Sequence, residues 1–325
     1  MNLIKIFFIF SLYFSFTNAQ VASFSFENDA IFETDKYYTN SVFLGWLSDD
    51  DTYDKEKYNS SFYNAINKIP FQNQRKNQSV QLHFEHLIFT PEDTEATEKI
   101  PNDVPYAGVA LFGISVYRWE EEYFHQFGLN LSLIGPSAFG EESQNGVHKM
   151  IGVDSANGWD NQLDDSLGIG ISYAYVDKIY QKNFNINQKI EITNQISFNL
   201  STAFRDAIVG TSFRYGYNTP DNFSTVGKTF GANQHYSLNL ESKKNDNLGV
   251  SLSYAFFYNY IDFFYITDHD DSYNVDMDHH IFGQIAGLDF YYNKYTLNIS
   301  IKKEEFLSKG DHSQRWGTFS IRKAF

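Results

Sequence analysis

Residue types that could do chemistry are most concentrated in one stretch of this chain, residues 135–152. The stretch lies between two segments with strand-like alternation, yet its own spacing is helical. On a helix, Glu141, Gln144 and His148 share one face, because residues three and four positions apart are neighbours. Ser137 suits the N-cap, and Glu141 suits the positive end of the helix dipole. This polar face fits acid–base chemistry, although an ordinary exposed loop helix would show the same pattern.

The first residues have the layout of a secretory signal peptide. Lys5 precedes a short run of apolar residues, and the small residue Ala19 follows soon after. The apolar run is too short to span a membrane. We therefore expect residues 1–19 to be removed, leaving residues 20–325 as one domain outside the cytoplasm.

Composition indicates a membrane protein without membrane helices. The sequence contains 32 Phe and 23 Tyr, and no cysteine. After residue 20 it has no apolar run of about twenty residues, which a transmembrane helix requires. Alternating aromatic and polar residues are typical of transmembrane β-barrels, whose outer wall is apolar and whose lumen is polar. The formal net charge of −15 argues against nucleic acid as a partner, since phosphate binding requires Lys and Arg.

The elements around the helical stretch are predicted strands. Period-two alternation predicts an all-β fold, a single transmembrane antiparallel β-barrel of about 12 strands with a short helix in an outer loop. The predicted strands cover residues 21–28, 39–48, 78–89, 106–118, 123–134, 167–175, 188–202, 206–217, 247–263, 279–292, 294–305 and 314–325. If the first strand starts on the periplasmic side, the long loops lie at the outer rim, whereas insertions at 49–77 and 218–246 lie on the periplasmic side. A short helix is expected near residues 60–68.

This topology brings further polar residues to the rim that carries the helix. Asn28 and Asp29 end the first strand, and Thr39 starts the second, so we expect them to lie close together and near Gln144 and His148. Oxygens from such residues suit Ca²⁺, which takes six to eight oxygen ligands. A histidine beside the cation would deprotonate water while the cation stabilises the oxyanion of an attacked ester. Asn, Asp and Thr are also common turn formers, which is the alternative explanation.

Several motifs, taken in order and spacing, resemble the outer-membrane lipid A 3′-O-deacylase family. The resemblance covers the mature chain; it is motif-based to about residue 175 and follows only the barrel pattern beyond. The motifs are Phe26-Glu27-Asn28-Asp29, Thr34-Asp35-Lys36-Tyr37-Tyr38-Thr39-Asn40, Asp103-Val104-Pro105-Tyr106-Ala107-Gly108, the stretch 135–152, and Gly158-Trp159-Asp160-Asn161-Gln162-Leu163.

The resemblance implies a twelve-stranded, calcium-dependent hydrolase that removes the ester-linked 3′ acyloxyacyl group of lipid A. It implies His148 as general base, Asn28 and Asp29 in the Ca²⁺ and active-site constellation, and Thr39 and Gln144 nearby. A family glutamate six residues after the histidine corresponds to Asp154, a shorter carboxylate that would be a further metal ligand. A family lysine expected after the third strand has no clear match in residues 90–99.

Other readings remain open from the sequence. The same site chemistry fits an outer-membrane phospholipase, and the barrel pattern alone fits a non-catalytic porin or adhesin. The acidic and histidine-rich residues 267–280 could bind divalent ions, although a solvated loop is the simpler explanation. No Gly-x-Ser-x-Gly elbow supports a serine hydrolase. We expect an outer-membrane lipid A deacylase, monomeric and surrounded by outer-membrane lipids, with its active site toward the outer leaflet and lipopolysaccharide as substrate.

Overall fold

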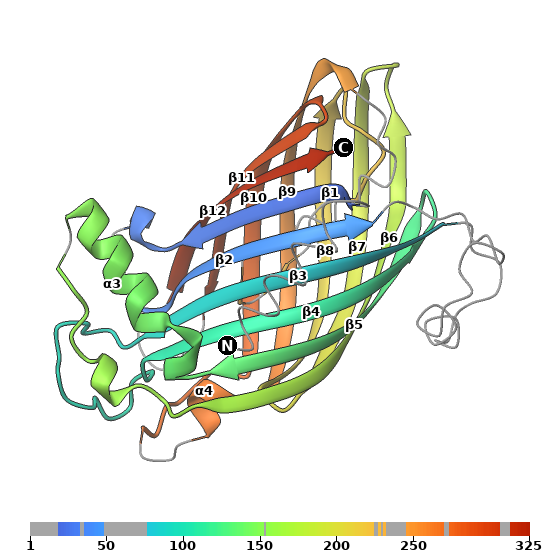
Figure 1. Cartoon of the computed structure of the whole chain (residues 1–325). Coiled ribbons are helices and arrows are strands. Elements are labelled where there is room, and N and C mark those ends of the chain that lie inside the picture. The colour runs from blue at the N-terminus through green and yellow to red at the C-terminus, as the bar shows by residue number, and fades with distance from the viewer. Residues whose placement is uncertain are drawn as a thin grey trace.

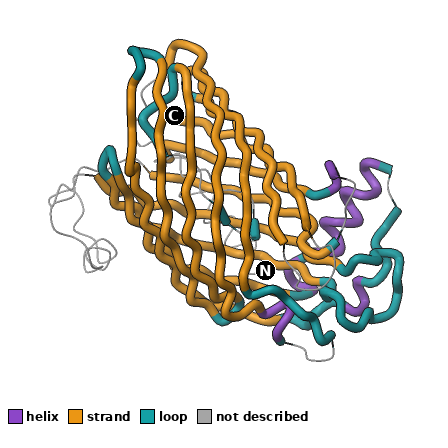
Figure 2. Tube along the Cα trace, turned by 180° about the vertical axis from the view of Figure 1, so that it is seen from behind, coloured by secondary structure: helices purple, strands orange, loops and turns teal. Residues whose placement is uncertain are grey.

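The chain forms one closed β-barrel. This computed structural model describes residues 19–32, 36–48, 77–152, 154–223, 227–228, 230–231, 245–269, 273–305 and 313–325. The barrel has twelve strands, each hydrogen-bonded to its sequence neighbours, and β1 pairs with β12 to close it (Figures 1 and 2). All pairings are antiparallel. Closure leaves no unpaired strand edge, which a barrel in lipid requires.

The strands agree with the twelve that alternation predicts, to within a few residues at most ends; β6 extends further than predicted. Their bounds are β1 Ala19–Asn28, β2 Tyr37–Ser48, β3 Asn77–Thr90, β4 Ala107–Trp119, β5 Tyr123–Ile134, β6 Ser166–Asn183, β7 Gln188–Ser201, β8 Phe204–Tyr217, β9 Asn245–Phe264, β10 His280–Asn293, β11 Tyr295–Glu305 and β12 Ser313–Ala324. Between them lie the short helices η1 Ala30–Phe32, η2 Pro136–Ala138, α3 Gly140–Ile151, η3 Trp159–Asn161 and α4 Tyr265–Asp268. No described helix is both long and apolar enough to cross a membrane.

Side chains alternate between the two faces of the wall as a membrane barrel requires. Outward positions carry exposed apolar residues such as Leu129, Leu131, Ile169 and Ile171. Inward positions are mostly polar and buried. The helices and the described loops that carry them gather at one end of the barrel, and tight turns such as that after Asn293 lie at the other (Figures 1 and 2).

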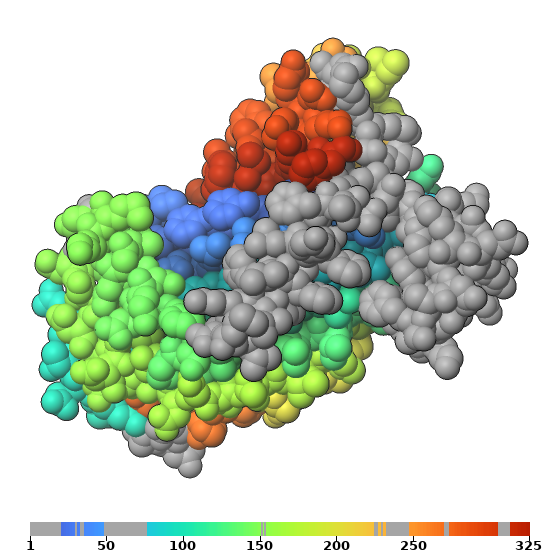
Figure 3. All heavy atoms as spheres, in the orientation of Figure 1, coloured from blue at the N-terminus to red at the C-terminus, as the bar shows by residue number. Residues whose placement is uncertain are grey.

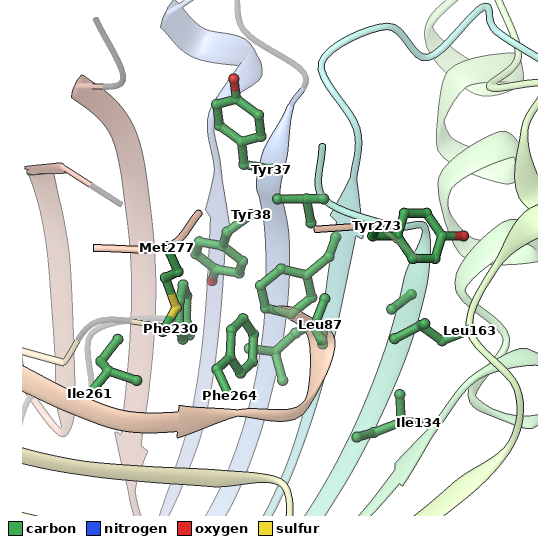
Figure 4. Packing of buried hydrophobic residues seen from close by; sticks show 14 of the residues in the cluster. Tyr37, Tyr38, Leu87, Ile134, Leu163, Phe230, Ile261, Phe264, Tyr273 and Met277 are labelled. Atoms are coloured by element: carbon green, nitrogen blue, oxygen red, sulfur yellow. The ribbon is translucent and has the colours of Figure 1, made fainter. Parts of the chain in front are cut away.

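In the connection between β8 and β9, Lys228, Phe230 and Gly231 lie inside the barrel, not beneath it. Lys228 forms an ion pair with Glu85 of β3 at 2.6 Å, and the backbone N–H of Gly231 donates to the Tyr38 hydroxyl of β2 at 3.0 Å. Phe230 packs against Tyr38 and Phe89 in the apolar cluster shown in Figure 4. The prediction of a periplasmic insertion over 218–246 is therefore wrong for these residues. The expected insertion at 49–77 and the helix near 60–68 fall almost entirely outside the described residues.

The lumen is filled in layers. An apolar cluster closes the end near the helices; it includes Tyr38, Phe89, Phe230, Phe264 and Trp316. A second cluster, which includes Val21, Leu47, Tyr117, Phe124 and Phe223, closes the opposite end. Buried polar and charged side chains occupy the space between the two clusters.

One buried carboxylate ties four elements together near the helix-bearing end. Glu27 of β1 forms an ion pair with Lys302 of β11 at 3.0 Å, and both side chains are fully buried. The carboxylate also accepts hydrogen bonds from the Tyr38 hydroxyl at 2.9 Å and from Thr318 of β12 at 2.6 Å. The Lys302 ammonium in turn donates to the carbonyl of Lys228 at 3.3 Å. These bonds compensate the desolvation of two charges, which would be costly if either were left alone.

The Glu27–Lys302 pair predicts a distinct pattern of stability changes. Lys302→Met should destabilise the barrel by about 3–5 kcal/mol, because it leaves an uncompensated carboxylate in the lumen. The double variant Glu27→Gln with Lys302→Met should recover most of that loss. Urea unfolding in detergent micelles, followed by heat-modifiable gel mobility, measures both. Wild-type stability in the single variant would contradict the role assigned to the pair.

Candidate active site

The corner between β1 and β2 fixes the first two predicted site residues. Asn28 is the last residue of β1 and pairs with Asn40 of β2, as the predicted hairpin requires. The next residue, Asp29, is fully buried; its backbone N–H donates to the carbonyl of Thr39 at 3.2 Å. Its Oδ2 accepts the backbone N–H of Lys36 at 3.3 Å. The backbone of Asp29 is therefore held at the rim by Thr39, and its carboxylate is oriented by the main chain of Lys36.

Thr39 owes its position to an irregularity in strand pairing. The register between β2 and β3 shifts between Tyr38 and Asn40, and such a bulge re-aims the side chains beside it. Both Tyr38 and Thr39 are consequently buried. The Thr39 hydroxyl shares a hydrogen bond of 2.9 Å with the hydroxyl of Thr90. Tyr38 serves the lumen network, whereas Thr39 lies beside the backbone of Asp29.

The loop between β3 and β4 borders this corner. Asp103 accepts backbone N–H groups of Glu92 at 2.9 Å and Val104 at 2.7 Å, which folds the loop back on itself. Burial raises the pKa of the Asp103 carboxyl, and these two hydrogen bonds act in the opposite direction. Lys36 forms an ion pair with Glu92. A lysine thus reaches this loop from the start of β2, although residues 90–99 offered no match for the family lysine.

The predicted helix exists, but its N-terminus differs from the prediction. Helix α3 begins at Gly140, and its N-cap is Phe139, which has a left-handed backbone conformation with φ of 60°. Ser137 lies in η2 and is not the cap. Its hydroxyl and its backbone N–H instead bond to the carboxylate of Asp165, at 2.6 Å and 2.8 Å. Ser137 therefore anchors the start of the loop to its end.

The inner face of α3 carries two of the three residues expected on it. Gln144 and His148 are buried, as their spacing of four predicts. Glu141 is exposed, so its expected place on the same face is wrong. The helix packs on the barrel along positions 140, 144 and 148, which are buried. Position 141 lies just outside this row and faces solvent. Glu141 remains in the first turn, where its charge suits the helix dipole.

Helix α3 docks on the barrel wall through a contact between glycines. A Cβ atom on Gly108 of β4 would come within 2.8 Å of the backbone of Gly140, and a Cβ on Gly140 would come within 2.6 Å of the Trp159 ring. Trp159 packs on Tyr106 and donates from Nε1 to the Gln144 side-chain oxygen at 3.0 Å. The missing side chains let helix and strand approach closely, and Trp159 fills the space beside them.

The histidine has a defined tautomer. His148 Nδ1 lies 2.7 Å from the carbonyl oxygen of Asp154, and a carbonyl can only accept, so Nδ1 carries the proton. Nε2 is then the basic nitrogen. Asn145 holds this carbonyl segment in place: its amide donates to the Ala156 carbonyl at 3.2 Å and accepts the Ala156 backbone N–H at 2.9 Å. The side chain of Asp154 is exposed, and the residue contacts His148 through its main-chain carbonyl.

Both groups of residues lie at the helix-bearing end. Helix α3 contacts β3 and β4, and Figures 1 and 3 show it at the end of the barrel where β1 ends and β2 begins. His86, pointing outward from β3, donates from Nε2 to the Ala138 carbonyl at 2.8 Å and so ties η2 to the wall. The structure thus places Asn28, Asp29 and Thr39 on β1 and β2, and Gln144 and His148 on a helix that packs on β3 and β4 at the same end of the barrel.

The donor set at this corner is rich in oxygen and poor in histidine. Within the described residues, no group of three or more His, Asp or Glu side chains is placed to hold a metal ion. A metal site here would combine the Asp29 carboxylate with amide, hydroxyl and main-chain oxygens. Such a set fits Ca²⁺, whereas zinc sites are built from Cys and His. In the competing patch at 267–280, the buried side chains among the described residues are those of Thr267, Tyr273 and Met277.

Comparisons with known proteins show the family and the fold of this chain. A family model described as "Outer membrane protein LpxR" matches residues 3–325. The chain belongs to the LpxR family. LpxR from Salmonella typhimurium has a similar fold, with a TM-score of 0.73 at 15% identity, over 94% of this chain and 100% of that one. A comparison with curated protein sequences gives no significant match.

Other barrels resemble the LpxR-family chain only weakly. The β domain of the Bordetella autotransporter BrkA covers 95% of this chain and 100% of its own at 9% identity, with a TM-score of 0.46. The KdgM porin covers 94% and 99% at 6% identity, with a TM-score of 0.37. Neither likeness bears on function. The family assignment confirms the resemblance to the lipid A 3′-O-deacylase family and the outer-membrane location.

Some contributors to the LpxR-family site have no obvious sequence signal. Asn145 and His86 bond to main-chain carbonyls, and the partners of such bonds cannot be located before the loop path is known. Glu27 and Lys302 could be recognised from the sequence, since both are charged residues at inward positions of predicted strands. Charged side chains in such positions require a partner.

The glycine contact under α3 gives a test with a matched control on the same helix. Gly140→Ala should destabilise the protein by about 1–3 kcal/mol, because the added methyl overlaps the Trp159 ring and the Gly108 backbone. Gly146→Ala should be neutral or stabilising by about 0.5–1 kcal/mol, since nothing lies within 4 Å of that site and alanine favours helix. Urea unfolding monitored by tryptophan fluorescence compares them. Equal stabilities would contradict the close packing.

Proposed function

We propose that this protein is a lipid A 3′-O-deacylase that hydrolyses the ester-linked 3′ acyloxyacyl group, with His148 as general base and the active site toward the outer leaflet. One observation carries the proposal: a buried histidine of fixed tautomer faces the barrel wall at the end where Asp29 is buried. Membership of the LpxR family supplies the substrate class.

The chemistry follows from the positions of the protein's own groups. His148 Nε2 accepts a proton from a water molecule as its oxygen attacks the ester carbonyl. The Asp154 carbonyl, bonded to Nδ1–H, holds the imidazole in place and favours the positive charge that forms on it. When the tetrahedral intermediate collapses, the imidazolium returns the proton to the departing 3′ oxygen of the sugar. The products are a free sugar hydroxyl and an acyloxyacyl carboxylic acid.

Asn28 and Asp29 are the residues that would hold Ca²⁺, with Thr39 beside them and Gln144 completing the polar face. Bound there, the cation would supply the positive charge that stabilises the oxyanion of the intermediate. Asp154 positions His148 through its main-chain carbonyl, and the Asp154→Ala variant described below decides whether its exposed carboxylate is also the metal ligand that the resemblance implies.

Two alternatives remain as outcomes of experiment. A porin would need an open lumen. In this barrel, described residues of the apolar clusters at both ends and of the β8–β9 connection occupy the lumen. A phospholipase would use the same groups on a different ester. Incubation of the purified protein with lipid A and with glycerophospholipid, followed by mass spectrometry of the products, separates the two substrates.

The role of His148 predicts a contrast between two neighbouring variants. His148→Gln should lower the rate of lipid A deacylation by about 10²–10⁴-fold, the usual contribution of a general base. Asp154→Ala should retain activity within about threefold, because a main-chain carbonyl survives the substitution. Initial rates from mass spectrometry, at equal amounts of folded protein, measure both. A loss in Asp154→Ala as large as that in His148→Gln would show that its carboxylate takes part.

Calcium dependence is a separate prediction. Chelation should abolish deacylation by the wild-type protein, and added Ca²⁺ should restore it, because oxygen ligands centred on Asp29 favour a hard cation. Asp29→Asn should raise the Ca²⁺ concentration needed for half-maximal activity by at least about tenfold, since it removes one ligand charge. Titration of activity with Ca²⁺ measures this. Full activity in excess chelator would rule out the metal.

A further inference from the structure

Helix α3 carries an apolar flank that plays no part in the candidate active site. Its N-cap Phe139 is 46% exposed, Val147 is 44% exposed and Met150 is 80% exposed. Spacings of eight and three residues bring these three side chains to one side of a helix. The flank lies next to the row of buried positions that packs on the barrel, and no described part of the chain buries it.

The opposite flank of α3 is charged. Glu141, Glu142 and Lys149 are all exposed there. The buried row at positions 140, 144 and 148 separates this charged flank from the apolar one. A short helix that is apolar on one exposed side and charged on the other is typical of helices that lie at a membrane surface, with each side in the medium that suits it.

The helix lies where the lipid-facing wall of the barrel ends. It packs on the outside of the wall, because Gly108 and His86, which contact Gly140 and the Ala138 carbonyl, point outward from β4 and β3. The loop that carries α3 joins β5 to β6. Leu167, the second residue of β6, is an outward apolar side chain with 82% exposure. The apolar outer wall therefore continues up to the loop from which the helix projects.

The direction of the helix decides which flank faces the membrane. Figure 1 shows α3 running across the strands, from its start beside β4, where Gly140 meets Gly108, toward the side on which β1 ends. Because an α-helix is right-handed, this direction turns the flank with Val147 and Met150 toward the membrane-spanning part of the wall. The same direction turns the charged flank away from the membrane.

We propose that the apolar flank of Phe139, Val147 and Met150 contacts the acyl chains of the membrane leaflet at this end of the barrel, so that α3 is an interfacial helix. The consequence for catalysis rests on the deacylase function proposed above. His148 follows Val147 directly, so the lipid contact holds it near the depth at which ester bonds join acyl chains to their headgroups. A lipid substrate then reaches the site sideways within the leaflet, without leaving the bilayer.

The depth of the helix can be measured directly, because the chain has no cysteine and single cysteines can be labelled. Nitroxide labels at Val147→Cys and Met150→Cys report the apolar flank, and labels at Glu142→Cys and Lys149→Cys report the charged one. In phosphatidylethanolamine–phosphatidylglycerol vesicles, power-saturation EPR compares collisions with oxygen, which concentrates in lipid, and with a water-soluble nickel chelate. The oxygen-to-nickel ratio should be several-fold higher on the apolar flank and approach that of Leu131→Cys on the lipid-facing wall.

Two results would overturn the lipid contact. One is an equal oxygen-to-nickel ratio on the two flanks. The other is dipolar broadening between labels at Met150→Cys, which would show a second copy of the chain on this flank. Because the EPR measurement does not involve catalysis, a lipid-embedded flank in a protein that leaves lipid A intact supports this inference and refutes the proposed function.

A kinetic comparison tests the consequence for the site. Val147→Thr with Met150→Gln makes the flank polar at similar size, and its apparent KM for lipid A in vesicles should rise about fivefold or more because the helix loses apolar contact. Its kcat should hold, since the catalytic groups are untouched. Glu142→Gln, on the charged flank, is the matched control and should change neither constant. An unchanged KM, or a loss confined to kcat, would overturn the proposed role of the flank.

Discussion

The buried carboxylate of Glu27 is the interaction on which the geometry of the site depends. It binds Lys302, Tyr38 and Thr318 at once, and Asn28 follows it directly in β1. Tyr38 likewise precedes Thr39 in β2, so the two strands that supply Asn28, Asp29 and Thr39 are tied at a single point. Fully buried charges do not tolerate misplacement, because a lost partner leaves a desolvated charge behind. The cost of disorder at this point makes the corner rigid.

The position of helix α3 depends on two residues that lack side chains. Helix α3 can bring Gln144 and His148 to the wall because Gly108 and Gly140 have no side chains to separate them. Trp159 then occupies the adjoining space and orients Gln144 through its Nε1–H. Two different interactions therefore position the residues at this rim. An ion-pair network inside the barrel fixes the strands, and small residues on its outside fix the helix. The orientation of His148 depends on a third, the main-chain carbonyl of Asp154.

The barrel could be predicted from the sequence because the alternation of apolar and polar side chains depends only on the position of each residue within its own strand. Alternation along each strand records the two faces of the wall, so all twelve strands are recoverable without knowing their partners. The sequence also predicts the helix. It places the N-cap at Ser137, however, because a serine before acidic residues satisfies the usual capping pattern. In the fold that serine bonds to Asp165, which is distant in sequence and close only after the loop closes.

The positions that could not be predicted depend on contacts between distant segments. Nothing in the composition of residues 218–246 says that part of it enters the lumen, because Lys228 and Phe230 acquire their partners only when the barrel surrounds them. Likewise Glu141 fits helical spacing with Gln144, and only docking of α3 decides which side of position 141 faces solvent. Local pattern sets the elements, and tertiary contact decides which of their residues do chemistry.

The filled lumen has a consequence for the wall that surrounds it. The described residues fill much of the interior with apolar clusters and paired charges, and one of those pairs, Glu27 with Lys302, lies directly beside the candidate site residue Asn28. Porins and this protein share a wall architecture but place opposite demands on what it encloses. The interior of this barrel therefore acts as a core: its described side chains hold the wall in shape, where the interior of a porin holds water.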